Sequence, residues 1–283
     1  MSTRLKRVHW PHLALLAVLP AWFAVTRGLA PELRLAGWLA IAFAVLGVSE
    51  RLLPFRRDWQ ADQRGLRRDA TVLSLNTVVD SALGATLAAV ASRWPGGESA
   101  WPLSMQVLAG LALGELLAYA MHRASHGENW LWRVHVLHHR PERLNVANAL
   151  TAHPLNAAWD KLAHVLPMLV LGFGEEAVVA VTLFTLTQGL IVHANVAGTI
   201  GPLNLLLGSA ELHRLHHGID ERQAGNYGTA VPWWDLVFGT FRSRAVPAAV
   251  GVYAPARYPG EHAVTALLAL PFTRHRGSGP TEG

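Results

Sequence analysis

The sequence predicts an all-α integral membrane protein with about four transmembrane helices, a re-entrant helical hairpin and a cytoplasmic helical cap. Three observations support this fold class. Of the 283 residues, 51% are hydrophobic and only 15% are charged, which is the balance of a membrane protein. Apolar runs recur that approach the roughly 20 residues needed to cross a bilayer. Histidines gather in short boxes in the more polar sequence beyond the fourth run.

The N-terminal part of the chain, residues 1–121, is expected to form the transmembrane helices. Its apolar runs extend over about Trp10–Val25, Leu35–Val48, Ala70–Ala91 and Leu103–Met121. The last two runs are long enough to span a bilayer, whereas the first two are short for this. A signal peptide is a rival interpretation of the first run. It is disfavoured because Pro20 and Trp22 occupy the place of a small-residue cleavage site.

The basic residues predict how these helices are oriented. Arginines cluster after the second run, and they are Arg51, Arg56, Arg57, Arg64, Arg67 and Arg68. The loops on the other side of the membrane carry only Arg27, Arg34 and Arg93. Since basic residues are enriched in cytoplasmic loops, the N-terminus and the Arg-rich loop are expected in the cytoplasm. The fourth run then also ends on the cytoplasmic side.

A further apolar stretch, Leu162–Val192, is interrupted near its middle by Pro167, Gly172 and Gly174. Its two halves are expected to form a helical hairpin that enters and leaves on one side and returns His193 to the cytoplasm. A fifth and a sixth full crossing are the alternative. Residues 122–272 are expected to form the catalytic region. Residues 273–283 end in a Gly-, Ser- and Pro-containing segment and are expected to be a disordered tail.

The histidine boxes are the strongest functional signal. They are His122 and His126, then His135, His138 and His139, then His213, His216 and His217. Residues three and four apart share one face of a helix, so each box can direct its imidazoles at a metal ion. The adjacent histidines of an HxxHH box diverge by about 100°, so such a box can reach toward two ions. Eight imidazoles exceed the four ligands of a structural zinc site, and they predict two ions and a reactive centre.

The sequence lacks the residues that other kinds of metal site require. The chain has no cysteine, which excludes thiolate and iron–sulfur sites. It has neither the HExxH box of zinc proteases nor the Glu-x-x-His motif of carboxylate-bridged di-iron bundles. It also lacks a phosphate loop and a dinucleotide fingerprint, so any electron donor is expected to be a separate protein. The net charge of +5 comes from arginines between apolar runs, and we expect no nucleic acid partner.

Two polar residues of the fourth run share a stripe with the first histidine box. Glu115, Tyr119, His122 and His126 follow each other at helical spacing on one face. A carboxylate inside an apolar segment is costly and usually has a function. We expect Glu115 to hold the second N–H of a ligand histidine. A solvated Glu115 facing a polar gap is the alternative.

These motifs resemble the fatty acid hydroxylase / sterol desaturase superfamily of integral-membrane histidine-box di-iron enzymes. The resemblance covers about Glu115 to Phe272. Its elements are the Glu-x3-Tyr-x2-His-Arg-x2-His run from Glu115, Leu-Trp-Arg-x-His-x2-His-His from Leu131, His153-Pro154, His193-Ala194-Asn195, Glu-x-His-Arg-x-His-His from Glu211, and the later Asn-Tyr-Gly, Trp-Asp and Phe-Gly-Thr-Phe elements. Two positions depart from the family pattern: Thr151 stands where an arginine is frequent, and Asn156 where a glutamate is frequent.

The resemblance implies a cytoplasmic helical domain in which about ten histidines bind two iron ions, adding His153 and His193 to the eight box histidines. It implies O2-dependent hydroxylation or desaturation of a fatty acyl or sterol-like lipid in lipid biosynthesis. Iron would cycle between Fe2+ and Fe3+, with electrons from a reductase, ferredoxin or cytochrome-type protein. Glu115, Tyr119 and Asp235 are the candidates for catalytic support. The histidines outside all motifs are expected to be structural or solvated: His9, His12, His164, His262 and His275.

A membrane metal transporter or metal sensor is the alternative from another functional class. A transporter would place ionisable residues near mid-bilayer on several helices. Here the histidines gather after the fourth run and in the polar C-terminal half instead. A nearer rival is a desaturase of the acyl-CoA type. Its first box usually has four residues between the histidines, whereas three separate His122 from His126.

Overall fold

The computed structural model describes residues 8–93, 99–127, 129–219, 225–243, 247 and 249–273. Within these ranges the chain is helical, and it contains isolated β-bridges but no strand. The predicted all-α fold is therefore confirmed. The expected disordered tail lies outside the described residues, except for Thr273.

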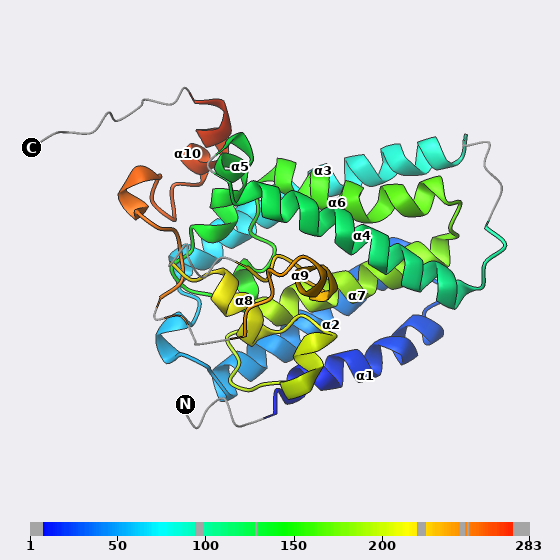
Figure 1. The fold of residues 1–283 in the computed structure, drawn as a ribbon, viewed down its shortest axis with the longest axis horizontal. Coiled ribbons are helices and arrows are strands. Elements are labelled where there is room, and N and C mark those ends of the chain that lie inside the picture. Colours follow the sequence, from blue (N-terminus) through cyan, green and yellow to red (C-terminus); the bar gives the residue numbers. More distant parts are fainter. Residues whose placement is uncertain are drawn as a thin grey trace, which may run out of the picture.

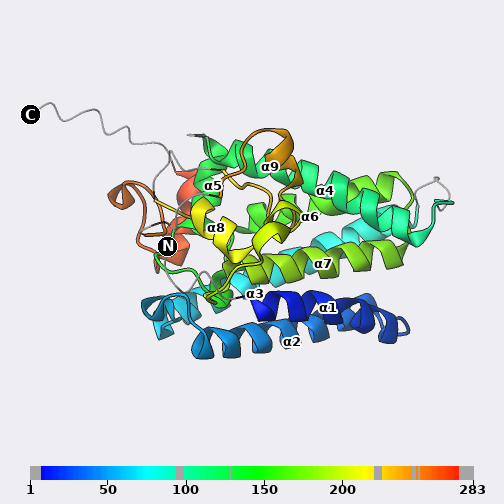
Figure 2. The ribbon, with the colours of Figure 1, turned by 60° about the horizontal axis from the view of Figure 1, so that its bottom comes forward.

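Long helices that run along a common direction form the body of the molecule (Figure 1). They are α1 (Trp10–Val25), α2 (Pro31–Leu52), α3 (Gln63–Ala91), α4 (Leu103–Ser125), α6 (Pro154–Val170) and α7 (Glu175–His193). Among the shorter helices, α5 (Trp130–His139), α8 (Ala210–His216) and α10 (Val264–Ala269) gather at one end, whereas α9 (Trp233–Val237) lies alongside the body (Figure 1). Turns of 3-10 helix occupy Arg57–Trp59, Val146–Asn148, Gly201–Leu205, Pro255–Arg257 and Leu270–Phe272. Figure 2 shows α1 and α2 as a layer against α7, with α4 and α6 on its other side.

Local sequence explains where these helices begin. Asp62, Asn129 and Ser209 are the N-cap residues of α3, α5 and α8, and each side chain accepts a hydrogen bond from the backbone N–H three residues on. Such caps satisfy N–H groups that have no partner within the helix. Pro31 and Pro154 open α2 and α6, where the missing N–H of proline costs nothing.

Helices long and apolar enough to cross a membrane are α2, α3, α4 and α7. The predicted number of about four spans is therefore met, although α7 takes the place that was predicted for the first run. Helix α1 begins and ends at the predicted residues but is 16 residues long. Helix α2 reaches 22 residues because it begins at Pro31, before the apolar run itself.

The α6–α7 hairpin extends as far as the other long helices. Its turn lies against the loop that joins α3 to α4, because the N–H of Ser99 donates to the carbonyl of Gly172 at 2.8 Å. The N–H of Gly174 donates to Gln106 Oε1 at 2.8 Å, close to the start of α4. The chain turns at Gly172, whose φ of +67° favours glycine. The predicted helical hairpin is therefore present, and of its two helices α7 is long and apolar enough to cross a membrane.

At the opposite end, the Arg-rich loop packs against the region that follows α7. The N–H of Phe55 donates to the carbonyl of Asn195 at 2.9 Å. The buried carboxylate of Glu50 accepts hydrogen bonds from the N–H groups of Val146 and Asn195 at 2.7 and 2.8 Å. This end also carries α5 and α8, so the Arg-rich loop and the histidine boxes share one end of the molecule (Figure 1).

The packed core lies between α1, α2 and α7, where Trp38, Leu46 and Leu190 are fully buried. The outer faces of the long helices are apolar as well: Val78 on α3 is 69% exposed and Leu108 on α4 is 60% exposed. Apolar side chains exposed along whole helices are what a surface in contact with lipid requires.

Candidate metal centre

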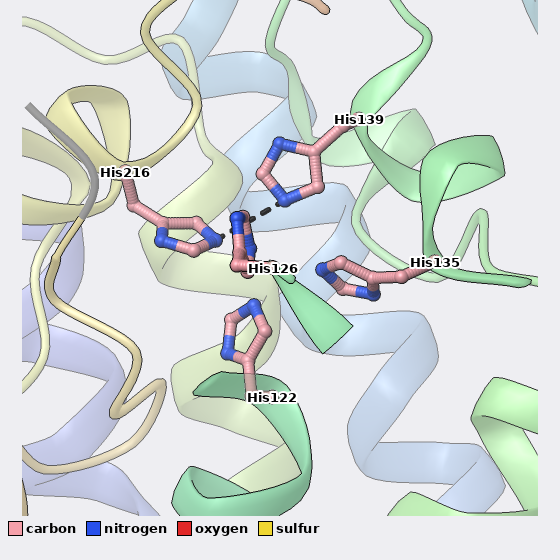
Figure 3. A group of neighbouring side chains, drawn as sticks. All are labelled: His122, His126, His135, His139 and His216. Atoms are coloured by element: carbon pink, nitrogen blue, oxygen red, sulfur yellow. Dashed lines mark hydrogen bonds between the residues drawn. The ribbon is translucent and has the colours of Figure 1, made fainter. Parts of the chain in front are cut away.

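Nine of the ten predicted ligand histidines come together in two neighbouring clusters. The first cluster contains His122, His126, His135, His139 and His216, and the second contains His138, His193, His213 and His217. Each histidine offers one ring nitrogen to its cluster, and within a cluster these nitrogens all lie within 4.8 Å of one another. Figure 3 shows the five rings of the first cluster turned toward a common point.

The HxxHH boxes divide between the two clusters. On α5, His139 joins the first cluster and the adjacent His138 joins the second, because neighbouring helical residues diverge by about 100°. The box on α8 divides in the same way, with His216 in the first cluster and His217 in the second. The clusters touch where the rings of His139 and His217 stack with centroids 4.2 Å apart.

Hydrogen bonds at Nδ1 fix the proton on most of these rings. The acceptors are carbonyl or amide oxygens, in the pairs His122 with Tyr227 (2.6 Å), His138 with Thr151 (3.2 Å), His193 with Gly189 (2.8 Å), His216 with Gly225 (2.9 Å) and His135 with the Asn156 side chain (2.6 Å). Since an oxygen can only accept here, Nδ1 carries the hydrogen and donates. In a neutral imidazole, Nε2 then presents a lone pair.

The Nε2 lone pairs of the cluster histidines point toward one another, and no hydrogen-bond donor lies between them. In the first cluster, Nε2 of His122, His126 and His135 is buried and has no hydrogen-bond partner. In the second, Nε2 of His193 lies 3.3 Å from Nε2 of His138. Both of these rings keep their hydrogen on Nδ1, so two lone pairs face each other. This arrangement is unfavourable unless a cation lies between the two nitrogens.

The spacing of the nitrogens fits ligands of a shared ion. Nitrogens bound at about 2.0–2.1 Å to one ion lie about 2.9–3.4 Å apart. In this structure, Nε2–Nε2 distances are 3.0 Å for His217 and His213, and 3.1 Å for His213 and His193. His216 and His139 are 3.2 Å apart (Figure 3). The clusters could thus each hold a metal ion with little rearrangement.

Burial keeps these imidazoles neutral. It lowers the pKa of His138 to about 4, and it lowers the pKa of His135, His139 and His217 well below the ordinary value. A neutral imidazole is the form that ligates a metal. Among the described residues, both clusters consist of histidine alone, which suits iron, zinc, copper or nickel. The donor set therefore fits the pair of iron ions that the resemblance implies.

Tyr119 and Asp235 belong to a network behind the first cluster. The carboxylate of Asp235 accepts from the N–H of Tyr227 at 2.9 Å, from the N–H of Gly228 at 2.8 Å and from the Thr240 hydroxyl at 2.7 Å. Tyr119 bonds to the same Thr240 hydroxyl at 2.9 Å. The network holds the carbonyl of Tyr227, which accepts from His122. Both predicted residues are thus linked by hydrogen bonds to the backbone that contacts His122.

Glu115 lies in a different place from the one expected. Its Oε1 accepts from Nε2 of His164 at 3.0 Å, and its Oε2 accepts from the N–H groups of Ala230 and Val231 at 3.2 and 3.4 Å. It touches no cluster histidine, and it is buried rather than solvated. The sequence matched His164 to no motif, yet this residue links Glu115 to α6.

Asn156, noted above only as a departure from the family pattern, and Asp160, which belongs to no motif, both contribute to the site. Asn156 uses Oδ1 to accept from His135 and Nδ2 to donate to Asp160 at 2.6 Å. His164 Nδ1 donates to the Asp160 carbonyl at 2.8 Å. The three residues follow each other at intervals of four on α6, and such a polar stripe on an otherwise apolar helix could have revealed them.

His153 stays outside both clusters. It is the N-cap residue of α6, where its Nδ1 accepts from the N–H of Leu155 at 3.1 Å. Its Nε2 donates to the carbonyl of Leu268 at 3.1 Å. Because both nitrogens are engaged in these contacts, we leave His153 out of the proposed ligand set.

Asn156→Leu is expected to reduce product formation by about 10–100-fold, the usual cost of losing a residue that orients a metal ligand. The variant leaves His135 without its acceptor, so the ring can rotate. Gln106→Leu is the matched control, since Gln106 is also buried but bonds to the Trp101 carbonyl and the Gly174 N–H, at the opposite end of α4 from the histidines. The measurements are the activity and the metal content of both purified variants. Equal losses in the two would mean that Asn156 has no special role.

The fold and the two clusters define a class: an integral membrane protein with two histidine clusters that could hold metal ions. Residues 107–240 match the sequence model of the fatty acid hydroxylase family, and this range contains all nine cluster histidines. Over these residues the chain carries a domain similar to that family, and it is an oxidoreductase. No solved structure matches the chain.

Curated proteins are similar in sequence to this chain over ranges of different length. Ornithine lipid hydroxylase OlsE of Rhizobium tropici is 29% identical over 94% of this chain and 83% of its own length. Human alkylglycerol monooxygenase is 32% identical over 48% of this chain, but over only 31% of its own length. Methylsterol monooxygenase 1 of Danio rerio is 28% identical over 50% of this chain and 48% of its own length. These relatives are lipid hydroxylases and monooxygenases, and nothing supports the transporter alternative.

Proposed function

We propose that the protein is a di-iron lipid hydroxylase that uses O2 to convert a C–H bond of a membrane lipid to an alcohol. The observation that carries the proposal is the pair of clusters in which Nε2 lone pairs face one another without a donor. Each HxxHH box serves both clusters, so two ions would be held close together. Hydroxylation is favoured over desaturation because the relatives named above are hydroxylases and monooxygenases.

When bound, the two iron ions would supply the redox chemistry that activates O2 for attack on an unactivated C–H bond. The chain's own residues hold neutral imidazoles in place and keep water away from the buried clusters. The Nδ1–H bonds to Tyr227 and Thr151 orient His122 and His138, one in each cluster. Each turnover consumes one O2, two electrons and two protons, with one oxygen atom entering the lipid and one leaving as water. The electrons are proposed to come from a separate reductase, ferredoxin or cytochrome-type protein.

We also propose that the metal centre faces the cytoplasm. The clusters lie at the end of the molecule that carries the Arg-rich loop between α2 and α3 (Figure 1). The opposite end carries few basic residues, among them Arg27 and Arg34, which pair with Glu176. The positive-inside rule then assigns the end with the clusters to the cytoplasm.

Incubation with ¹⁸O2, a reductase system and a membrane lipid extract tests the proposed reaction. One labelled oxygen is expected in the product alcohol, because the inserted atom comes from O2. His217→Ala is the control for non-enzymatic oxidation, and it is expected to give no product. An alcohol that takes its oxygen from labelled water would show that the centre hydrolyses or hydrates its substrate.

A further inference from the structure

A groove of about 510 Å³ runs along the outer face of α4, next to the face that carries His122 and His126. Its lining residues are Leu116, Tyr119, Ala120, Arg123, Ala124, Gly127 and Phe238. Those from α4 recur at helical spacing from Leu116 to Ala124, over about 12 Å of helix. The small side chains of Ala120 and Ala124 leave room between α4 and the end of α9. Apart from the Tyr119 hydroxyl and Arg123, the lining is apolar.

The groove lies at the depth of the membrane. The indole N–H of Trp234 on α9 donates to the carbonyl of Ala112, in the middle of a candidate membrane span. The neighbouring side chains Val237 and Phe238 are 66% and 49% exposed. Exposed apolar residues on a short helix at this depth indicate contact with lipid. The groove is therefore accessible from the bilayer.

Arg123 places a cation at the end of the groove nearest the histidine boxes. Its Nη1 donates to the Tyr119 hydroxyl at 3.2 Å, and among the described residues no carboxylate forms an ion pair with it. An arginine near the end of a membrane helix extends its charge toward the headgroup region. A guanidinium there suits a phosphate or a carboxylate. The charge and the apolar lining together fit an acidic lipid.

One aromatic ring separates the groove from the first cluster. The ring of Tyr119 lies 6.0 Å from that of Tyr227. The ring of Tyr227 in turn lies 5.2 Å from that of His126 and 5.7 Å from that of His216. A lipid in the groove would thus be held beside the metal centre, with its polar end close to the histidines.

We propose that the groove between α4 and α9 binds an acidic lipid, with its phosphate or carboxylate on Arg123 and one acyl chain along α4 toward Leu116. The further statement that this bound lipid is also the substrate rests on the proposed function. The binding of the lipid to the groove does not depend on that function.

Photocrosslinking of the full-length protein in lipid nanodiscs tests the proposal. The probes are a diazirine-bearing fatty acid, the same chain on a glycerol phosphate, and the uncharged alcohol of equal length. Both anionic probes are expected to label peptides from residues 116–127 and 232–241, and the alcohol to label them about 10-fold less. If only one anionic probe labels, its headgroup identifies which acid the groove selects. Equal labelling by all three probes would overturn the role of Arg123.

Variants define the site without relying on turnover. Arg123→Gln and Ala120→Trp are each expected to lower anionic labelling by roughly 10-fold, while metal content shows that the protein still folds. Arg67→Gln and Ala88→Trp are the matched controls, because both residues are exposed on α3 away from the groove. Unchanged labelling in Arg123→Gln and Ala120→Trp would overturn the groove as a lipid site, even if ¹⁸O incorporation continued. Intact labelling without any O2-dependent product would overturn the proposed function alone.

Discussion

Alanine in place of His138 or of His139 is expected to abolish product formation, a loss of about 10³-fold or more, while the protein still inserts in the membrane. The two residues are adjacent in the chain but belong to different clusters. Either substitution therefore removes one ligand from one ion and leaves the other ion's ligands intact. Because the two ions are proposed to act together on O2, damage at either one stops the reaction. Product formation by membranes that contain equal amounts of each variant measures this effect.

Two other histidines provide the contrast. His262→Ala is expected to leave activity unchanged, since this side chain is 36% exposed and lies near Glu261. His153→Gln is expected to retain both ions, because His153 caps α6 and joins neither cluster. Substantial activity in His138→Ala or His139→Ala would refute a coupled centre. If the His153→Gln variant lost an ion, His153 would have to be counted among the metal ligands.

Chelation is expected to remove all activity, and Fe2+ alone is expected to restore it. Zinc should bind to the same sites, because imidazole ligands accept it readily. It should not restore turnover, because zinc has no redox chemistry. Activity and metal content after reconstitution with each ion are the measurements. A zinc-loaded protein as active as the iron-loaded protein would indicate hydrolysis or a structural role for the metal.

Much of the fold could be predicted because the membrane constrains it. Hydropathy placed the ends of α1 at Trp10 and Val25, where the structure also has them. The start of α2 was missed because Pro31 opens the helix ahead of the apolar run. The position of the turn between α6 and α7 depends on contacts such as that of Ser99 with Gly172, which join loops far apart in the sequence. Periodicity carries no information about such contacts.

The metal centre was predictable to the extent that helical geometry builds it. Spacing of three and four residues put the box histidines on shared faces, and the divergence of adjacent histidines anticipated the two clusters. The supporting residues were harder to find. Glu115 was assigned to a histidine ligand, but its partner is His164, which a different helix brings within 3.0 Å. The oxygen that accepts from His135 belongs to Asn156, where the family resemblance led us to expect a glutamate.

Elemental analysis of the purified protein, expressed with iron supplied, tests the central claim most directly. The structure predicts two ions per chain, one for each histidine cluster. It also predicts that His139→Ala and His138→Ala each retain about one ion. The ion that is lost belongs to a different cluster in each variant. A wild-type protein that binds at most one ion, or a His138→Ala and His139→Ala double variant that keeps both, would contradict the account.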